Sequence, residues 1–314
     1  MAEIYHGRGA AIGLGEESTY GTAVSRTNWR PLISSELTRT IEKVPRPNLR
    51  VGANGAMRRA HYVQADNAGG SFEIEATYEN VGMILKHVMG THTSPTGSGP
   101  YTHTYTFADD LPTGLTIENV RGTGTSEIFE GCRINSATFS VSAGGVMTIG
   151  AEVIAETSAT RGSAGSPSFG SGDTPVLHSH ATTLSYNGAT YDLVDMTLTI
   201  NNALATRQHL GSSVTKQPLR SDFQSVELSV TLEVSDTAYA AFTADSVSDA
   251  VITFNAGSQA FQVNVHNAYI SAATDPVSDA NIISQSLTFV GQSDGTDEGC
   301  KLIVVNNTSS STGN

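Results

Sequence analysis

Two groups of residues in this chain could carry out chemistry, and neither is arranged for it. His178 and His180 alternate, so on a strand both imidazoles would lie on one side, as metal ligands do, but no cysteine or carboxylate cluster completes the set. The glycines at Gly13–Gly15 suggest a phosphate-binding loop, but no Lys-Ser or Lys-Thr pair follows them. The sequence also lacks the G-x-S-x-G and H-E-x-x-H motifs. We therefore predict a protein that is not an enzyme, with no metal site and no cofactor.

Carboxylates are regularly spaced in two other segments. Apolar and polar residues alternate in SFEIEATY (71–78) and in SVELSVTLEV (225–234), and this period of two predicts strands with one buried and one polar face. The polar positions are Glu73, Glu75 and Thr77 in the first segment and Glu227, Ser229, Thr231 and Glu233 in the second. A solvated sheet face is the simplest interpretation. The alternative is an acidic wall that many subunits share.

The elements that must position these residues occur twice, in the same order. LTRTI (37–41) matches MTLTI (196–200), which aligns Thr38 with Thr197 and Thr40 with Thr199. Each of the two alternating segments follows a long polar stretch and precedes a short helical pattern. Further along, Phe129 aligns with Phe261 and Asn135 with Asn267. We predict a duplicated, mainly β chain with domains at 1–155 and 176–314, joined by a polar linker at 156–175.

Charge is unevenly divided between these halves. The formal net charge is −13, and residues 1–155 carry 12 basic and 15 acidic groups, whereas residues 156–314 carry 5 and 15. Such a protein repels nucleic acid and anionic membranes on average. No apolar run reaches membrane-spanning length, so we expect a soluble protein made in the cytosol. Cys132 and Cys300 are then expected to be reduced thiols.

Two long segments are predicted to form arms. The first, 42–70, has two prolines and a turn signal, and most of a basic cluster lies in it. That cluster comprises Arg39, Lys43, Arg46, Arg50, Arg58 and Arg59. It lacks the interleaved aromatic residues of a nucleic-acid site, so docking on an acidic protein surface is favoured over nucleic-acid binding. A solvated face is the other alternative. The second arm, 201–224, is far less basic.

Taken together, these elements resemble the tail tube proteins (major tail proteins) of long-tailed bacteriophages. The resemblance is carried by GLGEESTYGTAV (13–24), the strand near Leu37, the long arm, and SFEIEATY with its helix. It implies two tandem tail-tube-like β-sandwich or barrel domains, each with one short α-helix and a long β-hairpin arm. It also implies a structural virion protein whose rings stack into a hollow tube that conducts DNA during ejection.

Further expectations follow from this resemblance. The residues expected to face the lumen are Thr38, Thr40, Glu73, Glu75, Thr77, Thr197, Thr199, Glu227, Ser229, Thr231 and Glu233, and those expected in an inter-ring arm are Lys43, Arg46, Arg50, Arg58 and Arg59. With two copies per chain, three chains would close a pseudo-hexameric ring. Family analogy adds the tape measure, tail terminator and distal tail proteins as partners, and assembly in the host cytoplasm. The alternatives are a carbohydrate-binding or adhesin-like β-sandwich and the tube protein of a bacterial injection apparatus.

Overall fold

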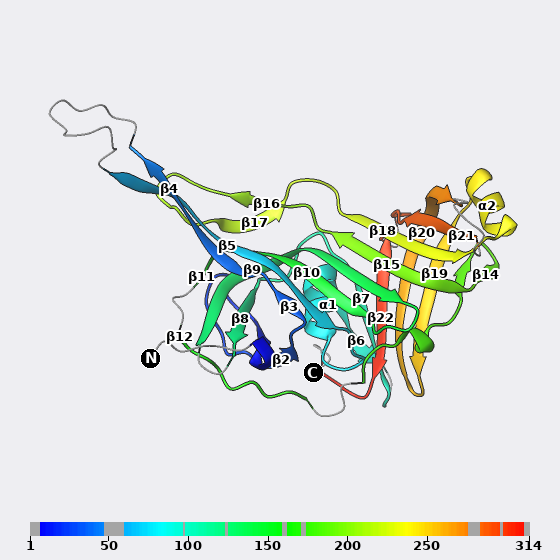
Figure 1. Cartoon of the computed structure of the whole chain (residues 1–314), viewed down its shortest axis with the longest axis horizontal. Helices are drawn as coiled ribbons and strands as arrows, with labels where there is room; N and C mark the ends of the chain where they lie inside the picture. The colour runs from blue at the N-terminus through cyan, green and yellow to red at the C-terminus, as the bar shows by residue number, and fades with distance from the viewer. Residues whose placement is uncertain are drawn as a thin grey trace.

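We analysed a computed structural model, which describes residues 7–46, 60–96, 98–122, 125–158, 162–170, 174–275, 283–295 and 298–310. The chain is mainly β, as predicted, and antiparallel pairing joins most of its strands into large sheets (Figure 1). Each half contributes one α-helix, α1 (Gly82–Met89) in the first and α2 (Asp236–Thr243) in the second. Neither of these helices, within the described residues, has the length and apolar character needed to cross a membrane.

Strands of the first half form two sheets that share the long strand β9. In the first sheet β4, β5, β10 and the C-terminal part of β9 lie side by side, and in the second β2, β1, β8 and the N-terminal part of β9 do so. The bounds are β1 (Ala11–Glu16), β2 (Asn28–Pro31), β4 (Thr38–Pro45), β5 (His61–Glu75), β8 (Leu115–Arg121), β9 (Thr125–Ser142) and β10 (Thr148–Ala155). The short strand β3 (Ser34–Ser35) pairs with β5 ahead of β4.

Strands of the second half pair in the same order. The pairing order β4–β5–β10–β9–β8 of the first half is matched by the pairing order β15–β18–β21–β20–β19 of the second. The bounds are β13 (Leu184–Tyr186), β14 (Ala189–Tyr191), β15 (Leu193–Asn201), β18 (Ser225–Glu233), β19 (Val247–Ala256), β20 (Gln259–Thr274), β21 (Ser284–Val290) and β22 (Cys300–Asn306). Each strand that the repeat pattern predicts therefore occurs at its expected place in both halves.

Two β-bulges mark matching positions in β9 and β20. Glu130 and Gly131 together oppose Thr116 on β8, and likewise His266 and Asn267 together oppose Asp249 on β19. Gly131 has φ +63° and Asn267 has φ +48°, so each bulge contains a left-handed residue of a type that tolerates this conformation. A second bulge lies four residues later in both strands, at Asn135 and at Ser271.

These bulges correct the residue-level alignment of the two halves. They match Gly131 with Asn267 and Asn135 with Ser271, whereas the sequence identities indicated Asn135 with Asn267. The alignment from sequence is wrong here by four positions. Because a strand pattern repeats every two residues, a shift of four leaves the buried and exposed positions unchanged and is invisible to pattern matching.

In the first half, a buried carboxylate accepts the hydrogen bond of the backbone N–H that the bulge leaves without a strand partner. Glu17, from the GEESTYGT segment, is 2% exposed and accepts hydrogen bonds from the Gly131 N–H (2.9 Å), the Thr116 hydroxyl (3.0 Å) and the Gly21 N–H (2.9 Å). In the second half Asp249 accepts the Asn267 N–H at 3.1 Å, and it lies on the neighbouring strand. The motif that suggested the family resemblance is therefore a structural clamp on the β8–β9 pair.

The two halves are joined by pairing and by packing. β9 pairs with β15 from Ser136–Asn201 to Ser142–Asp195, which makes one continuous sheet of the two inner sheets. The hairpin of β6 (Gly90–Thr96) and β7 (Tyr101–Phe107) pairs with β22. One hydrophobic cluster spans both halves, with Phe139 of the first and Phe261 of the second at a ring-centroid distance of 6.2 Å.

The two arms lie against each other. The first is the β4–β5 hairpin, which extends away from the body in Figure 1, and its central residues 47–59 lie outside the described residues. The second is the shorter hairpin of β16 (Leu204–Arg207) and β17 (Lys216–Arg220). The Asp66 N–H of β5 donates to the Ser213 carbonyl, and the Thr215 hydroxyl donates to the Asn67 side chain. The second arm therefore braces the base of the first.

The predicted linker, 156–175, is bonded to the first half at several of its described residues. β11 (Thr157–Ser158) and β12 (Gly162–Ser163) both pair with β9, and the Gly165 N–H donates to Glu118. A Cβ at Gly165 would lie 2.9 Å from Glu118 Oε1 and 3.0 Å from the Trp29 ring, so only glycine lets the chain approach this closely. The small residues that indicated a flexible tether instead permit close contact.

Candidate functional site

A continuous polar face crosses six strands of the inner sheet, three from each half. The register forms one row in which Glu73 lies opposite Gly150, Gly150 opposite Thr138, Thr138 opposite Thr199, and Thr199 opposite Glu227. A second row contains Glu75, Thr148, Ser140, Thr197, Ser229 and Thr288 in the same order of strands. Alternate residues of these strands, such as Phe72, Leu198 and Leu228, are buried in the core below.

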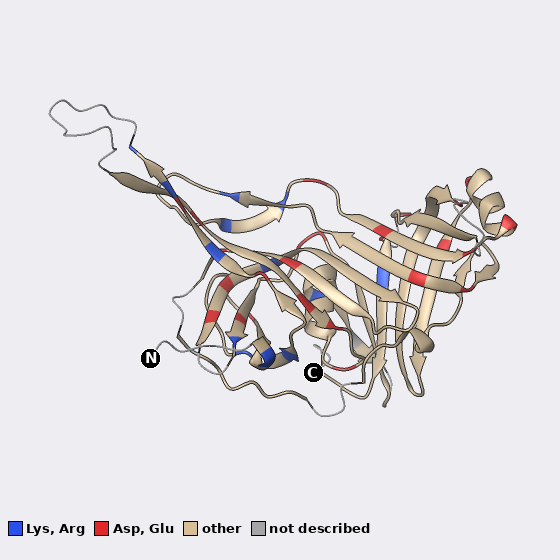
Figure 2. Ribbon diagram, viewed as in Figure 1, with Lys and Arg blue, Asp and Glu red and all other residues tan. Residues whose placement is uncertain are grey.

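The charge on this polar face has one sign. Its ionisable residues are Glu73, Glu75, Glu152, Asp195, Glu227 and Glu233, and no Lys or Arg occupies a polar-face position of these strands in the described segments 71–75, 136–142, 148–152, 195–201, 225–233 and 284–290. The remaining polar positions are mainly hydroxyls, which bond within the face. Ser136 donates to Glu152 at 3.0 Å, and the hydroxyls of Ser140 and Thr148 lie 3.0 Å apart. The face is therefore acidic and coated with neutral hydroxyls. Figure 2 marks acidic residues of these strands in red.

Most residues that were predicted to face a lumen lie on this polar face. Glu73, Glu75, Thr197, Thr199, Glu227, Ser229, Thr231 and Glu233 are all on it. Thr38 and Thr40 are exposed on β4, opposite Gly69 and Asn67, which continue the Glu73 side of β5 toward the arm. The sheet thus brings together residues that are 150 positions or more apart in the sequence.

Thr77 was expected on the same face, and this expectation is wrong. Thr77 is 4% exposed, its hydroxyl donates to the Glu79 carbonyl, and it accepts a hydrogen bond from Arg30 Nη2 at 2.7 Å. β5 ends at Glu75, so the alternation of exposed and buried residues no longer applies at Thr77. Thr77 instead forms an isolated antiparallel bridge with Pro175.

Sequence reasoning missed the part of the polar face that β9 and β10 provide. Glu152 is exposed there and accepts hydrogen bonds from Ser136 and Asn135. The signal was present in two alternating segments. INSATFSVS (134–142) places hydroxyl residues at every second position from Ser136, and VMTIGAEV (146–153) places Thr148, Gly150 and Glu152 between apolar residues. Without the observed strand pairing, nothing indicated that these two strands share a face with SFEIEATY and SVELSVTLEV.

The predicted basic arm is described only at its base. Lys43 and Arg46 are exposed near the end of β4, and Arg50, Arg58 and Arg59 lie outside the described residues. Arg39 forms a bidentate ion pair with Asp66, at 2.8 and 2.6 Å, and this pairing holds the pKa of Asp66 below its usual range. Arg39 is therefore a structural residue of the hairpin.

Other candidate residues have local structural partners. His178 and His180 form a 3₁₀ turn instead of a strand, with His178 Nδ1 3.3 Å from the Gly145 carbonyl and His180 Nδ1 3.0 Å from the Tyr78 hydroxyl. Within the described part of the chain, no group of three or more His, Cys, Asp or Glu side chains is arranged to hold a metal ion. Cys132 and Cys300 are both buried and free, and burial raises the pKa of each thiol.

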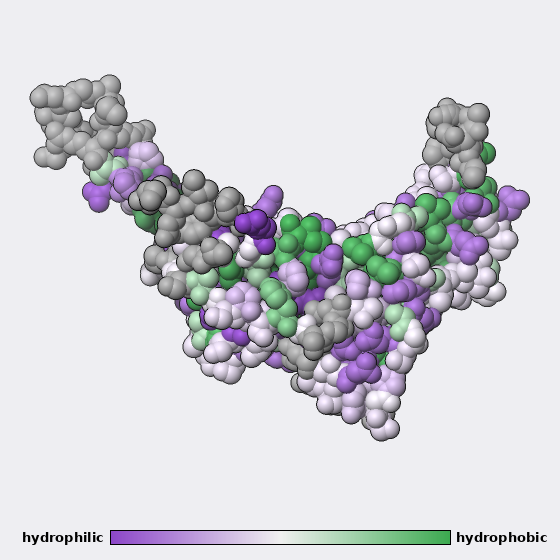
Figure 3. All heavy atoms as spheres, turned by 60° about the horizontal axis from the view of Figure 1, so that its bottom comes forward, coloured by the Kyte–Doolittle hydropathy of each residue, from purple (hydrophilic) through white to green (hydrophobic). Residues whose placement is uncertain are grey.

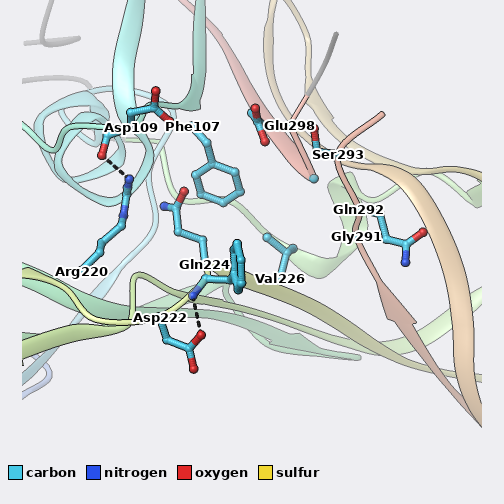
Figure 4. Close-up of a pocket in the computed structure, with 12 residues that line it drawn as sticks. Phe107, Asp109, Arg220, Asp222, Gln224, Val226, Gly291, Gln292, Ser293 and Glu298 are labelled. Atoms are coloured by element: carbon cyan, nitrogen blue, oxygen red, sulfur yellow. Dashed lines mark hydrogen bonds between the residues drawn. The ribbon is translucent and has the colours of Figure 1, made fainter. Parts of the chain in front are cut away.

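A pocket of about 730 Å³ opens between the halves (Figure 4). Phe107 and Asp109 form one side of it, Gln224 and Val226 another, and the loop around Gly291 a third. Arg220 lies at its edge and donates to the Ala108 and Asp109 carbonyls, both at 2.6 Å.

In a comparison with known protein families, the chain matches one family model. The family described as "Phage tail tube protein" matches residues 7–291, which covers all of α1, α2 and the polar face. No curated protein matches the chain.

Proposed function

This chain belongs to the phage tail tube protein family, a structural family of the virion tail, and we propose that its polar face lines the bore of a tube built from stacked rings. The observation that carries this proposal is the continuity of that face. Both halves contribute to one antiparallel sheet whose polar side has six acids and no base in the six strand segments given above.

The chemistry of the polar face suits the passage of DNA. Contacts from Lys and Arg to phosphates dominate the nonspecific affinity of proteins for DNA, so a conducting surface should lack them. Exposed carboxylates repel phosphates over about 8 Å at physiological salt, which keeps DNA away from the wall. Hydroxyls such as Thr138 and Thr199 keep the surface wetted without adding charge. DNA would then slide through without specific binding.

Charge reversal on the polar face tests this function. The variant Glu73→Lys, Glu75→Lys, Glu227→Lys should fold and assemble, because these side chains are exposed or partly exposed and make no buried contact. We expect tubes that retain DNA and virions with impaired ejection. A matched control carries three Lys substitutions at exposed sites off the face, at Glu36, Asp192 and Asp222. Equal ejection by both variants, or tubes with these glutamates on the outer surface, would refute the proposal.

We propose further that the chain contains two copies of the tube fold, so that three chains form a pseudo-hexameric ring. The shared pairing order and the two matched bulges in β9 and β20 support duplication. Covalent linkage raises the effective concentration of one copy for the other to roughly millimolar, which favours their pairing without new contacts. End-on electron microscopy of single rings together with native mass spectrometry distinguishes three chains per ring from six.

The first arm is proposed to contact the next ring. Its base is exposed and carries Lys43 and Arg46, and the second half of the chain is strongly acidic. Deleting 47–57 should leave the halves folded and the rings intact but should prevent stacking. Association should weaken with salt, because exposed charge pairs are screened. Stacking by the deletion variant would refute this role. By family analogy, the tape measure, tail terminator and distal tail proteins are proposed partners, and assembly would occur in the host cytoplasm.

A further inference from the structure

Helix α2 is exposed where its counterpart α1 is buried. In α1 every residue except Lys86 is buried, whereas in α2 only Ala238 and Ala241 are. Counted from the first helical residue, Leu85 (0% exposed) and Tyr239 (48% exposed) occupy the same position. Val234, Val247 and Ile283, also at this end of the molecule, are 40–49% exposed. These residues with Tyr239 are called the α2 patch, and hydrophobic side chains are visible at this end in Figure 3.

Part of the cover on α1 comes from the second half. Asn202, which directly follows β15, is 0% exposed and donates to the Val88 carbonyl of α1 at 3.0 Å. The same amide donates to the Ile134 carbonyl at 3.0 Å, and the Asn202 N–H donates to the Asn135 carbonyl at 2.7 Å. The end of β15 thus lies along the edge of β9 and seals one side of α1. Nothing equivalent covers α2 in the described chain.

The matched bulges identify which residues would provide this cover in another copy. Matching Asn135 with Ser271 makes Thr138 equivalent to Thr274 and Ser71 equivalent to Ser229. Gly69 is then equivalent to Glu227, and their partners Thr38 and Thr199 are equivalent as well. Counting on by three residues, Ile41 corresponds to Asn202. Leu37 and Leu198 are equivalent by the same count, and both are buried, which supports the register.

Both strands that this correspondence brings together have an open edge. In the described chain β4 pairs along Thr38–Glu42 with β5 alone, and β20 pairs along Ala272–Thr274 with β21 alone. Open edges with unpaired N–H and C=O groups are templates for pairing with another chain. Ile41, on β4, is 42% exposed, although its counterpart Asn202 is fully buried.

Charges at the two ends are complementary. Lys43 and Arg46 follow Ile41 on the arm, and Glu233, Asp236 and Asp245 surround α2. Figure 2 shows basic residues along the β4–β5 hairpin and acidic residues on the α2 end, at opposite extremes of the molecule. A contact between opposite ends of identical chains is heterologous, and heterologous contacts close into rings when the rotation permits.

We propose that the β4 edge of a second copy docks on the α2 end of this chain and repeats the β9–β15 junction. Thr38 of the second copy lies opposite Thr274, as Thr199 lies opposite Thr138 within the chain. Ile41 covers the α2 patch as Asn202 covers α1. This interface rests on the proposed ring, and it specifies which residues form the chain-to-chain contact and in which register.

Cysteine cross-linking tests the register. Directly opposite residues of antiparallel strands lie about 4.5–5.5 Å apart, within the range of a disulfide. The variant Thr38→Cys, Thr274→Cys should therefore form disulfides between chains under mild oxidation, seen as dimers and trimers on a non-reducing gel. The matched control is Thr38→Cys, Ala273→Cys, whose second thiol is shifted by one residue to the opposite face of the strand. The native cysteines are at most 1% exposed and should not compete.

A complementation experiment tests the contact between Ile41 and the α2 patch. Ile41→Asp and Tyr239→Asp each place a charge in the contact, and each should weaken association on the order of tenfold or more. Neither should unfold the chain, because both side chains are exposed, and thermal unfolding checks this. Mixed in equal amounts, the two variants retain one intact junction between them and should form dimers but no rings. Phe169→Asp, at a side chain that is 50% exposed elsewhere, is the control and should assemble normally.

The possible outcomes separate this interface from the proposed function. If the unaltered chain forms rings but the Thr38→Cys, Thr274→Cys variant does not cross-link, or if Ile41→Asp forms normal rings, the interface is overturned and the tube function stands. Preferential cross-linking of the Ala273 control would overturn the register. Failure of the unaltered chain to form any ring or tube would instead contradict the proposed function.

Discussion

The two halves of the molecule share a ladder of strands but stabilise it with different residues. At the first bulge, Gly131 is left-handed and its N–H bonds Glu17, which is 114 residues away in the sequence. At the matching bulge, Asn267 is left-handed and its N–H bonds Asp249, only 18 residues away on the neighbouring strand. The same backbone distortion therefore depends on a distant, buried clamp in one half and on a local, partly exposed contact in the other. This difference predicts unequal costs for equivalent substitutions.

The largest effect is expected when the two clamps are removed. Glu17→Ala leaves the Gly131 N–H and the Thr116 hydroxyl buried without their acceptor, and should lower the free energy of unfolding by about 2–4 kcal/mol. Asp249→Ala should cost about 1 kcal/mol, because water can reach the Asn267 N–H. Urea unfolding of the two variants measures both costs. Equal costs would mean that the two clamps do not differ in the way that their burial indicates.

Exchanging the left-handed residues should give the next largest effect. A Cβ at Gly131 would lie 2.9 Å from both Tyr20 Cζ and Glu156 Cβ, in a backbone conformation that side chains disfavour. Gly131→Ala should therefore destabilise the protein by about 1–3 kcal/mol. Asn267→Gly relieves the strain at a non-glycine residue and should change stability by less than about 1 kcal/mol. Thermal unfolding midpoints compare the two, and a tolerated Gly131→Ala would contradict the tight packing.

The other bulge residues, Glu130 and His266, should both make the protein less stable as the pH rises, but in different pH ranges and for different reasons. Burial opposes charge on His266, but Asp294 and Asp249 outweigh it and raise the pKa of the imidazole. Its stabilising contribution is then complete below about pH 6.5 and is lost as the pH rises through the raised pKa. Burial, followed by Glu17 and Glu156, raises the pKa of Glu130, so stability falls as the pH rises from the ordinary carboxyl pKa through the raised one.

Glutamine substitutions separate these two contributions. His266→Gln should be less stable than the unaltered chain at pH 5.5 and equally stable at pH 9. Glu130→Gln should be more stable than the unaltered chain at pH 7 and equally stable below pH 4, where both side chains are uncharged. Urea midpoints measured across this pH range provide the test. A pH-independent difference for either variant would assign its effect to packing.

The smallest effect is expected at Arg39, the first-half counterpart of the fully buried Ile200. Arg39 is paired with Asp66 at a partly exposed site, where screening by solvent limits an ion pair to about 0.5 kcal/mol. Arg39→Gln should cost that amount at neutral pH. The cost should vanish as the pH falls through the lowered pKa of Asp66, because the carboxylate is then neutral. Chemical unfolding at pH 7 and pH 2 compares the two states, and a cost retained at pH 2 would contradict the ion-pair explanation.

Local pattern predicted much of this fold because alternation depends only on which residues are buried. The strand containing Glu227 and Glu233, both helices, and the order of elements in each half follow the sequence closely. Pattern could not fix the register between the halves, because a shift of four residues preserves alternation and the identities at Asn135 and Asn267 were misleading. It also could not locate the end of β5, and so it placed Thr77 on the wrong side.

The sequence by itself therefore determined the elements, their repetition and the acidic character of one strand face, because propensity and period are properties of neighbouring residues. The tertiary structure decided that strands of both halves join into one sheet and that Glu73, Glu152 and Glu227 share its polar face. It also decided that Glu17 serves as a clamp and that α1 is covered while α2 is not. Those outcomes depend on hydrogen bonds and packing between residues far apart in the chain, which no local pattern encodes.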